Sequence, residues 1–398
     1  MNRLTIEENF LDHAQQQALK KGLYEFPIFD ADCHYFATPF DELALLIEEP
    51  WRHRLRSATS GANRITAIPH DLGDRTLGGR TKVKEHFFNH PLQDGRHIAK
   101  EVSPLLHSFH QLAIDYGIVF PTDLLTLGLH PQSDYEVAIA FAYARWMTEK
   151  VLPSDESLKT MLYLPFSDPE ACVRLVREFA DKKGVVGFMV TSVRYQPVHH
   201  NAYMPLYQTL EETGKPLGFH TVSYWMERPF QQLNKFMSAH ALGFPLYNMI
   251  QVTNLVVNGI PERFPDLKFV FIEAGVTWIP FVMARLDSDY LQRSSEAPLL
   301  RKKPSAYIKN FYFTSQPLEG QENMKHLAAV FDMFDAENQL LYASDYPHQD
   351  FDTPSTIYDL PFLSETAKRK ILGGNALKLF GIEEPKLLAK RRFDDGRG

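Results

Sequence analysis

Cysteine is scarce in this chain. Only Cys33 and Cys172 occur among 398 residues. Small secreted folds held together by disulfides need more cysteines than this, so a disulfide framework is excluded and a reducing, cytoplasmic setting is the simpler expectation. We expect Cys33 to be a buried packing residue that faces away from its neighbours on the same strand.

Long apolar runs and a strong charge of one sign are also missing. No stretch of about 18 residues is free of charge and turn residues, so we expect no membrane span. The N-terminal segment MNRLTIEENFLDHAQQQALKKG lacks the apolar core of a secretory signal. The net charge is −7, and the densest cationic run is only Lys390-Arg391-Arg392, which we expect to be solvated. Nucleic-acid binding requires clustered cations, so we expect no nucleic-acid partner.

Eight short, β-rich apolar runs are present in a chain of ordinary globular composition, with 44% hydrophobic and 23% charged residues. The predicted strands are Phe26–Asp32, Tyr116–Pro121, Leu158–Pro165, Val185–Val193, Pro216–His220, Leu267–Glu273, Phe311–Ser315 and Leu340–Asp345. Helical patterns lie between most of them, at Glu136–Lys150, Asp168–Lys183 and Met204–Thr213. The last of these is followed by Gly214, a predicted C-cap.

Strands that alternate with helices predict an α/β fold with a parallel sheet. Because there are eight strands, and no glycine-rich phosphate loop follows the first, we favour a (β/α)8 TIM-type barrel over a doubly wound sheet. We expect an N-terminal helical extension at residues 1–25, the barrel at 26–382 and a charged C-terminal tail at 383–398. Residues 36–113, too many for a simple loop, predict a long insertion after the first strand, folded over the barrel mouth.

Metal-ligand residue types stand at the ends of three predicted strands. Asp32 and His34 are two residues apart and therefore share one face of the first strand. His220 ends the fifth strand and Asp345 the eighth. Because all strand ends of a barrel surround one mouth, we predict that these four residues hold a divalent ion. Their oxygen and nitrogen atoms suit Zn, Mn or Fe. Asp30, one layer deeper, should support them.

Longer motifs around these residues resemble the amidohydrolase superfamily, in its family 2 branch related to aminocarboxymuconate semialdehyde decarboxylase. The resemblance runs from about Phe26 to Ile382 and rests on DADCH, PLYQTLEETGKPLGFH, GIPERFPDLKFVFIEAGVTWIPFVMARLD, LLYASDYPHQDFDTP and GGNALKLFGI. It implies a metal-dependent barrel enzyme that acts on a small carboxylated or carbonyl compound by hydrolysis or non-oxidative decarboxylation. The family's metal ligands map to Asp32, His34, His220 and Asp345. In the family, this aspartate also helps to activate substrate or water.

The sixth strand departs from the family pattern. The related decarboxylases usually carry an acid–base histidine there, whereas this chain has Glu273. We expect His240 to supply the missing imidazole and to move protons with Asp345, supported by Glu273; a capping or core role for His240 is the alternative. Glu273 could orient a ligand, act as a base, or hold a second ion with His240.

No lysine ends the fourth strand, which favours one ion per chain. Arg194 is a candidate for binding a substrate carboxylate.

Two other functions stay open. A non-haem, iron-containing dinuclear oxygenase on the same barrel would use Glu273 and His240 for its second metal. A non-catalytic structural subunit of a hetero-oligomer is the third hypothesis, although none of the four ligands is lost.

We expect a small-molecule substrate and a homo-oligomer, with a hetero-oligomer not excluded. His348 could hydrogen-bond the eighth-strand aspartate or cap a turn.

Overall fold

Eight parallel strands form the centre of the molecule. The computed structural model describes residues 10–35, 38–59, 101–191, 196–220, 230–348 and 350–394. In the sheet each strand pairs with the next in the order β1 to β8. The strands are β1 (Phe29–Tyr35), β2 (Tyr116–Pro121), β3 (Leu158–Tyr163), β4 (Val185–Val190), β5 (Leu217–His220), β6 (Phe269–Ile272), β7 (Tyr312–Thr314) and β8 (Leu340–Leu341).

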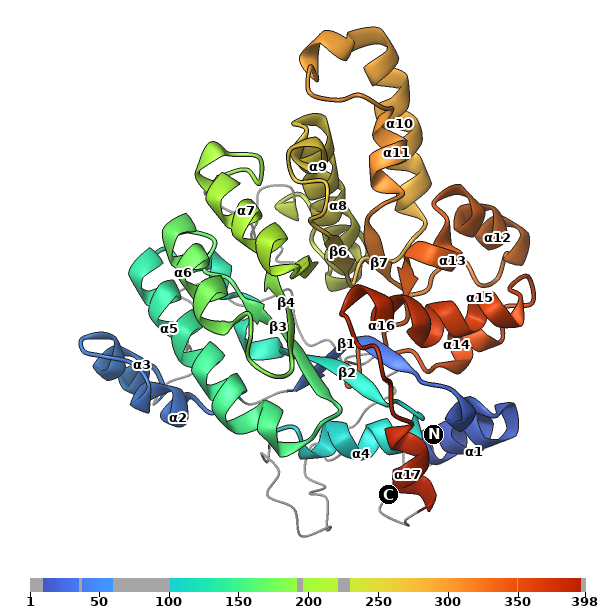
Figure 1. Ribbon diagram of the computed structural model, residues 1–398, viewed down its shortest axis with the longest axis horizontal. Coiled ribbons are helices and arrows are strands. Elements are labelled where there is room, and N and C mark those ends of the chain that lie inside the picture. The colour runs from blue at the N-terminus through green and yellow to red at the C-terminus, as the bar shows by residue number, and fades with distance from the viewer. Residues whose placement is uncertain are drawn as a thin grey trace.

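Helices surround the sheet in alternation with the strands (Figure 1). Those that follow strands β1 to β8 include α2 (Phe40–Leu45), α3 (Trp51–Thr59), α4 (Ser103–Gln111), α5 (Ser133–Trp146), α6 (Pro169–Phe179), α7 (Met204–Thr213), α8 (Phe236–Val257), α9 (Ile260–Arg263), α10 (Trp278–Arg293), α11 (Pro304–Ile308), α12 (Met324–Met333), α13 (Ala336–Gln339), α14 (Ser355–Tyr358), α15 (Glu365–Arg369) and α16 (Asn375–Leu379). Helix α7 ends, as predicted, at Gly214, whose φ is 63°. The predicted (β/α)8 barrel is confirmed. Residues 60–100 of the predicted insertion lie outside the described residues.

The barrel closes through backbone hydrogen bonds between β1 and the segment after β8. The amide of Asp345 donates to the carbonyl of Asp32 at 2.7 Å, and the amide of His34 donates to the carbonyl of Tyr346 at 2.7 Å. The first and last strands are therefore held side by side, and the chain segments that carry Asp32, His34 and Asp345 become neighbours.

Strand alternation decides which side chains face the barrel interior. Phe219, Phe271 and Phe313 stack on one another from β5, β6 and β7, with ring centroids 5.3 and 5.6 Å apart. Phe313 also packs against Trp278 of α10, which places this row under the helices. Since neighbouring residues of a strand point to opposite faces, His220 points from β5 into the barrel.

Strands β6 and β8 end earlier than predicted, and a residue in a left-handed conformation follows each of them. β6 ends at Ile272 and β8 at Leu341, whereas we expected Glu273 and Asp345 to be the last strand residues. Glu273 has φ 55° and Asp345 has φ 59°. Both are left-handed conformations that no strand can contain and that non-glycine residues seldom adopt. The two carboxylates thus project from sharp turns beyond the strands.

The C-terminal segment forms a packed helix where we expected a charged tail. Helix α17 (Leu388–Asp394) follows the barrel and lies near α1 (Phe10–Lys21) and α4 in Figure 1. Leu388 and Ala389 are buried. Arg392, predicted to be solvated, donates to Asp155 Oδ1 at 2.9 Å, and its side chain is only 11% exposed. The domain boundaries themselves stay a prediction.

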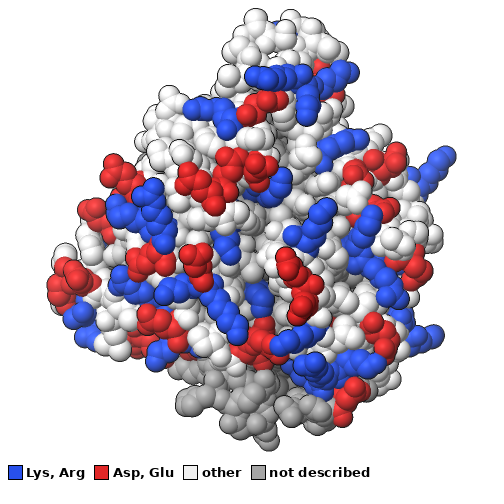
Figure 2. Space-filling model, viewed as in Figure 1, with Lys and Arg blue, Asp and Glu red and all other residues white. Residues whose placement is uncertain are grey.

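The surface carries charges of both signs. Figure 2 shows Lys and Arg interspersed with Asp and Glu over the described part of one face. Within the described residues, no helix combines the length and apolar character needed to span a bilayer.

Candidate metal centre

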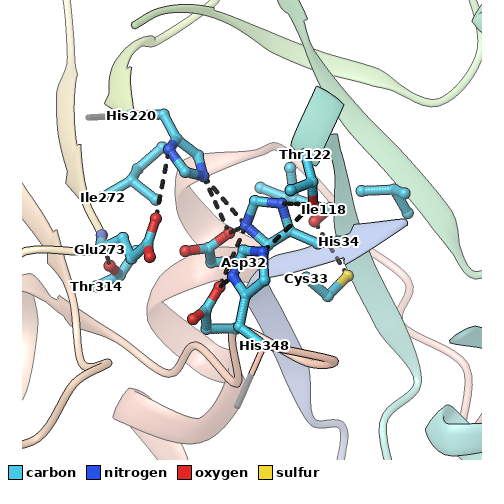
Figure 3. Close-up of polar contacts among 12 residues, drawn as sticks. Asp32, Cys33, His34, Ile118, Thr122, His220, Ile272, Glu273, Thr314 and His348 are labelled. Atoms are coloured by element: carbon cyan, nitrogen blue, oxygen red, sulfur yellow. Dashed lines mark hydrogen bonds and ion pairs between the residues drawn. The ribbon is translucent and has the colours of Figure 1, made fainter. Parts of the chain in front are cut away.

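Three of the four predicted ligands converge inside the barrel mouth. His34 Nε2 lies 3.0 Å from Asp32 Oδ1 and 3.3 Å from His220 Nε2, and His220 Nε2 lies 3.5 Å from the same Asp32 oxygen (Figure 3). All three side chains are fully buried. Their spacing on β1 and at the end of β5 brings two imidazole nitrogens and a carboxylate to one point.

Glu273 joins this group from the turn after β6. Asp32, His34, His220 and Glu273 each offer a ligand atom within 4.8 Å of the others. The Oε2 atom of Glu273 lies 3.7 Å from His220 Nδ1, the nitrogen that faces away from Asp32. Glu273 can therefore orient the His220 imidazole or act as a further ligand. This position is consistent with the expected role of Glu273 in orienting a ligand, and it lies near the metal site as predicted.

Asp345 reaches the cluster through His34. Its Oδ1 atom lies 3.3 Å from His34 Nε2 and 2.6 Å from His348 Nδ1, so Asp345, His34 and His348 make a second group that shares one imidazole with the first. Two roles were expected for His348, a hydrogen bond to the eighth-strand aspartate or a turn cap, and the contact of the first is present. Thr122, whose hydroxyl touches both His34 and His348, was not singled out because threonine gives no ligand signal.

Asp30 ties the two halves of the site together. Its Oδ1 atom accepts hydrogen bonds from the amides of Asp32, at 3.1 Å, and Ser344, at 2.8 Å. Ser344 Oγ donates to the other oxygen. Burial raises the pKa of Asp30 to about 7, although these hydrogen bonds act in the opposite direction. The residue holds β1 against the turn that carries Asp345, which matches the supporting role expected for it.

The electrostatics of the cluster fit a divalent cation. Three buried carboxylate oxygens accept no hydrogen bond from the described residues: Asp32 Oδ1, Asp32 Oδ2 and Asp345 Oδ2. Burial, followed by repulsion from Asp32, holds the pKa of Asp345 well above its usual range. Burial also raises the pKa of Asp32, but attraction to His220 and His34 outweighs it and leaves this pKa below its usual range. Because buried carboxylates need a counter-charge, a cation held by these oxygen and nitrogen atoms would offset the cost of burying them.

His240 lies apart from the ligand cluster. It belongs to α8, its side chain is 32% exposed, and its Nε2 atom is 3.9 Å from Asp350 Oδ2. Among the described residues, the groups able to share an ion do not include His240, so the alternative of a second ion at His240 and Glu273 gains no support. The fourth-strand candidate Arg194 lies outside the described residues.

A cavity of about 420 Å³ adjoins Glu273 between α8 and α10. Its walls are mainly apolar and include Phe244, Trp278 and Phe281, with His240 and Asp350 also in the lining. Such a cavity is large enough for a ring-sized molecule. Glu273 therefore stands between the buried ligand cluster and a space that can hold an organic body.

Comparison with known proteins identifies the family. Residues 29–382 match the family described as Amidohydrolase (Amidohydro_2). The chain belongs to this amidohydrolase family. The predicted membership is thereby confirmed for most of the chain's length.

Individual relatives of this amidohydrolase are distant. The chain is similar to a 2-amino-3-carboxymuconate-6-semialdehyde decarboxylase of Dictyostelium discoideum, with 23% identity over 56% of this chain and 61% of the relative. It is also similar to a gamma-resorcylate decarboxylase of Polaromonas sp., with 22% identity over 60% of this chain and 74% of the relative. The match to the Dictyostelium protein thus spans less than two thirds of that protein's length.

Solved structures share the amidohydrolase barrel. The structure is similar to a 5-carboxyvanillate decarboxylase of Sphingomonas paucimobilis, with a TM-score of 0.64 and 18% identity, covering 89% of this chain and 99% of the other. It is also similar to a dihydroxybenzoic acid decarboxylase of Polaromonas sp. with bound manganese and 2-nitroresorcinol, with a TM-score of 0.62 and 16% identity, covering 91% and 99%. At these identities the likeness establishes the fold.

Proposed function

We propose that this amidohydrolase is a metal-dependent enzyme that removes CO2, without an oxidant, from a small aromatic or unsaturated carboxylic acid. The observation that carries the proposal is the buried cluster of Asp32, His34 and His220, whose carboxylate oxygens lack hydrogen-bond donors while two imidazole nitrogens face them. The names of the relatives support decarboxylation over hydrolysis, and the manganese bound to one of them supports a manganese-type ion.

Each side chain would have a distinct task. Asp32, His34 and His220, with Glu273 or Asp345, would hold the ion, which when bound supplies Lewis-acid polarisation of a substrate oxygen. The carbon–carbon bond to the carboxyl group would break, its electron pair would stay on the substrate carbon, and a proton would replace the departing CO2. With Asp345 as the fourth ligand, Glu273, which borders the cavity and occupies the place of the acid–base histidine of related decarboxylases, would deliver that proton from its carboxyl group.

The substrate would lie in the cavity beside Glu273. Phe244 and Trp278 offer apolar surface for a ring, and Glu273 is the one described lining residue that also belongs to the ligand cluster. A carboxylate directed past Glu273 toward Asp32 and His34 would place its reacting carbon at the centre.

The proposal is tested by metal analysis and by CO2 release. Protein purified without added metal is analysed for bound elements, loaded with Mn²⁺, and given gamma-resorcylate, 5-carboxyvanillate and 2-amino-3-carboxymuconate-6-semialdehyde. We expect CO2 release from at least one acid and a loss of more than about 100-fold in kcat/KM on His220→Ala. The control is His326→Ala, an exposed histidine on α12.

Two results would count against this function. Unchanged turnover in His220→Ala would remove the cluster from the chemistry. A metal-loaded enzyme that releases no CO2 from the three acids but cleaves an amide or ester would favour hydrolysis instead.

A further inference from the structure

We propose that Thr122 is a positioning residue of the metal centre, because its hydroxyl fixes the proton positions on His34 and His348. The inference rests on the proposed metal-dependent function. It concerns how the chain prepares an imidazole to bind the ion, and it adds the end of β2 to the strands that build the site.

The hydroxyl of Thr122 bridges two histidines. Thr122 follows β2 directly, and its Oγ1 atom lies 3.3 Å from His34 Nδ1 and 3.3 Å from His348 Nε2 (Figure 3). The rings of His34 and His348 lie against each other, with centroids 4.3 Å apart. The remaining nitrogen of His348, Nδ1, lies 2.6 Å from Asp345 Oδ1. The remaining nitrogen of His34, Nε2, faces Asp32, His220 and Asp345 Oδ1.

With His34 and His348 neutral and Asp345 ionised, one assignment of protons links these contacts and leaves a nitrogen free to bind the ion. A neutral imidazole carries one proton, and an ion can bind only the bare nitrogen. If His34 Nε2 is to bind the ion, its Nδ1 must carry the proton and donate to Thr122 Oγ1. Thr122 has a single proton of its own, which it then donates to His348 Nε2.

The chain of donors ends on a carboxylate. With its Nε2 accepting from Thr122, neutral His348 carries its proton on Nδ1 and donates it to the ionised Asp345 Oδ1, which lies 2.6 Å away. Every link has one donor and one acceptor: His34 to Thr122, Thr122 to His348, and His348 to Asp345. The same chain of hydrogen bonds therefore stabilises the ionised form of Asp345 and the form of His34 that has no proton on Nε2.

The opposite direction would disable the site. If Thr122 donated to His34 Nδ1, the ring proton would move to Nε2, where it could be donated to Asp32 Oδ1 at 3.0 Å or Asp345 Oδ1 at 3.3 Å, and His34 could no longer bind an ion. Loss of the Thr122 hydroxyl removes the preference between the two proton positions. Partners of this kind, one contact removed from the ion, typically change metal affinity by about 10–100-fold.

The test compares Thr122→Val, which has nearly the same shape without the hydroxyl, with Thr122→Ser, which keeps it. The Kd for Mn²⁺ is measured from the electron paramagnetic resonance signal of the free ion in competition with a chelator. We expect Thr122→Val to raise Kd by about 10–100-fold and Thr122→Ser to stay within about threefold of the wild type. Thr126→Val, four residues further along and partly exposed, is the control and should leave Kd unchanged.

A second measurement reads the protons directly. In Zn²⁺-loaded protein with ¹⁵N-labelled histidine, the nitrogen chemical shifts of His348 should show the proton on Nδ1 in the wild type and a mixture in Thr122→Val. A wild-type His348 with its proton on Nε2, or a Thr122→Val protein with unchanged Kd, overturns the proposal.

These outcomes separate the two proposals. A wild type that binds Mn²⁺ without releasing CO2 contradicts the proposed reaction, while the Kd comparison still decides the role of Thr122. A wild type that binds neither ion contradicts both.

Discussion

At the residue scale, the barrel buries more carboxyl groups than its metal cluster needs. Glu136 of α5 is completely buried and accepts hydrogen bonds from Tyr163 Oη, at 2.6 Å, and Ser167 Oγ. Burial raises its pKa to about 7, while these hydrogen bonds act to lower it. Because the usual pKa of this group is 4.5, the unfolded chain ionises at lower pH than the folded one. Its contribution to stability is therefore complete below pH 4.5 and is lost as the pH rises toward 7.

Glu136→Gln should remove this pH dependence. The amide keeps the shape and a hydrogen-bonding oxygen but cannot ionise, so the variant should gain on the wild type as the pH rises from 4.5 to 8, by on the order of 2–3 kcal/mol in the free energy of unfolding. Urea unfolding across this pH range measures the difference. The exposed Glu322→Gln is the control. A constant difference between variant and wild type at all pH values would contradict the assigned pKa.

At the element scale, the sequence predicted those helices and strands whose formation depends on neighbouring residues. It did not predict features that depend on residues far away in the chain. Strand existence and helix α7 with Gly214 follow from local periodicity and turn chemistry, and both were predicted. The ends of β6 and β8 were misplaced because the left-handed conformations of Glu273 and Asp345 depend on tertiary contacts. Likewise, the anchoring of α17 depends on partners more than 200 residues away, such as Asp155, which no local pattern reveals.

The anchor of α17 makes two adjacent arginines unequal. Arg392→Ala should lower the free energy of unfolding by about 2 kcal/mol, because it leaves Asp155, 3% exposed, without its ion-pair partner. Arg391→Ala, which removes the same charge from an exposed position, should change it by less than about 0.5 kcal/mol. Chemical unfolding at fixed pH distinguishes them, and equal effects would show that the contact contributes nothing.

At the scale of the whole molecule, the site was predictable in outline because a barrel brings its strand ends to one mouth. Asp32, His34 and His220 could be chosen from strand position and residue type before any contact was known. Glu273 was also expected near the ion, but its contact with His220 and the separation of His240 from the cluster could not be chosen, since they depend on the path of the chain beyond β6 and along α8. Which of Glu273 and Asp345 completes the ligand set stays a prediction.

Metal binding should stabilise the entire fold, because the ligands come from β1, β5 and the turn after β6. At an Mn²⁺ concentration 100 times Kd, the free energy of unfolding should rise by about 2.7 kcal/mol. Asp32→Asn should lose most of this gain, whereas Asp289→Asn, on the exposed side of α10, should keep it. Unfolding curves with and without Mn²⁺ measure the gain, and its absence in the wild type would speak against a bound ion.

The closure of the barrel has a consequence for biosynthesis. β1 leaves the ribosome long before the segment after β8, and the backbone groups of Asp32 and His34 find these partners only when Asp345 and Tyr346 emerge. Until then the growing polypeptide exposes an unpaired strand edge that other chains could join. We expect nascent forms of this protein to depend on chaperones until β8 and the segment after it pair with β1 and close the barrel.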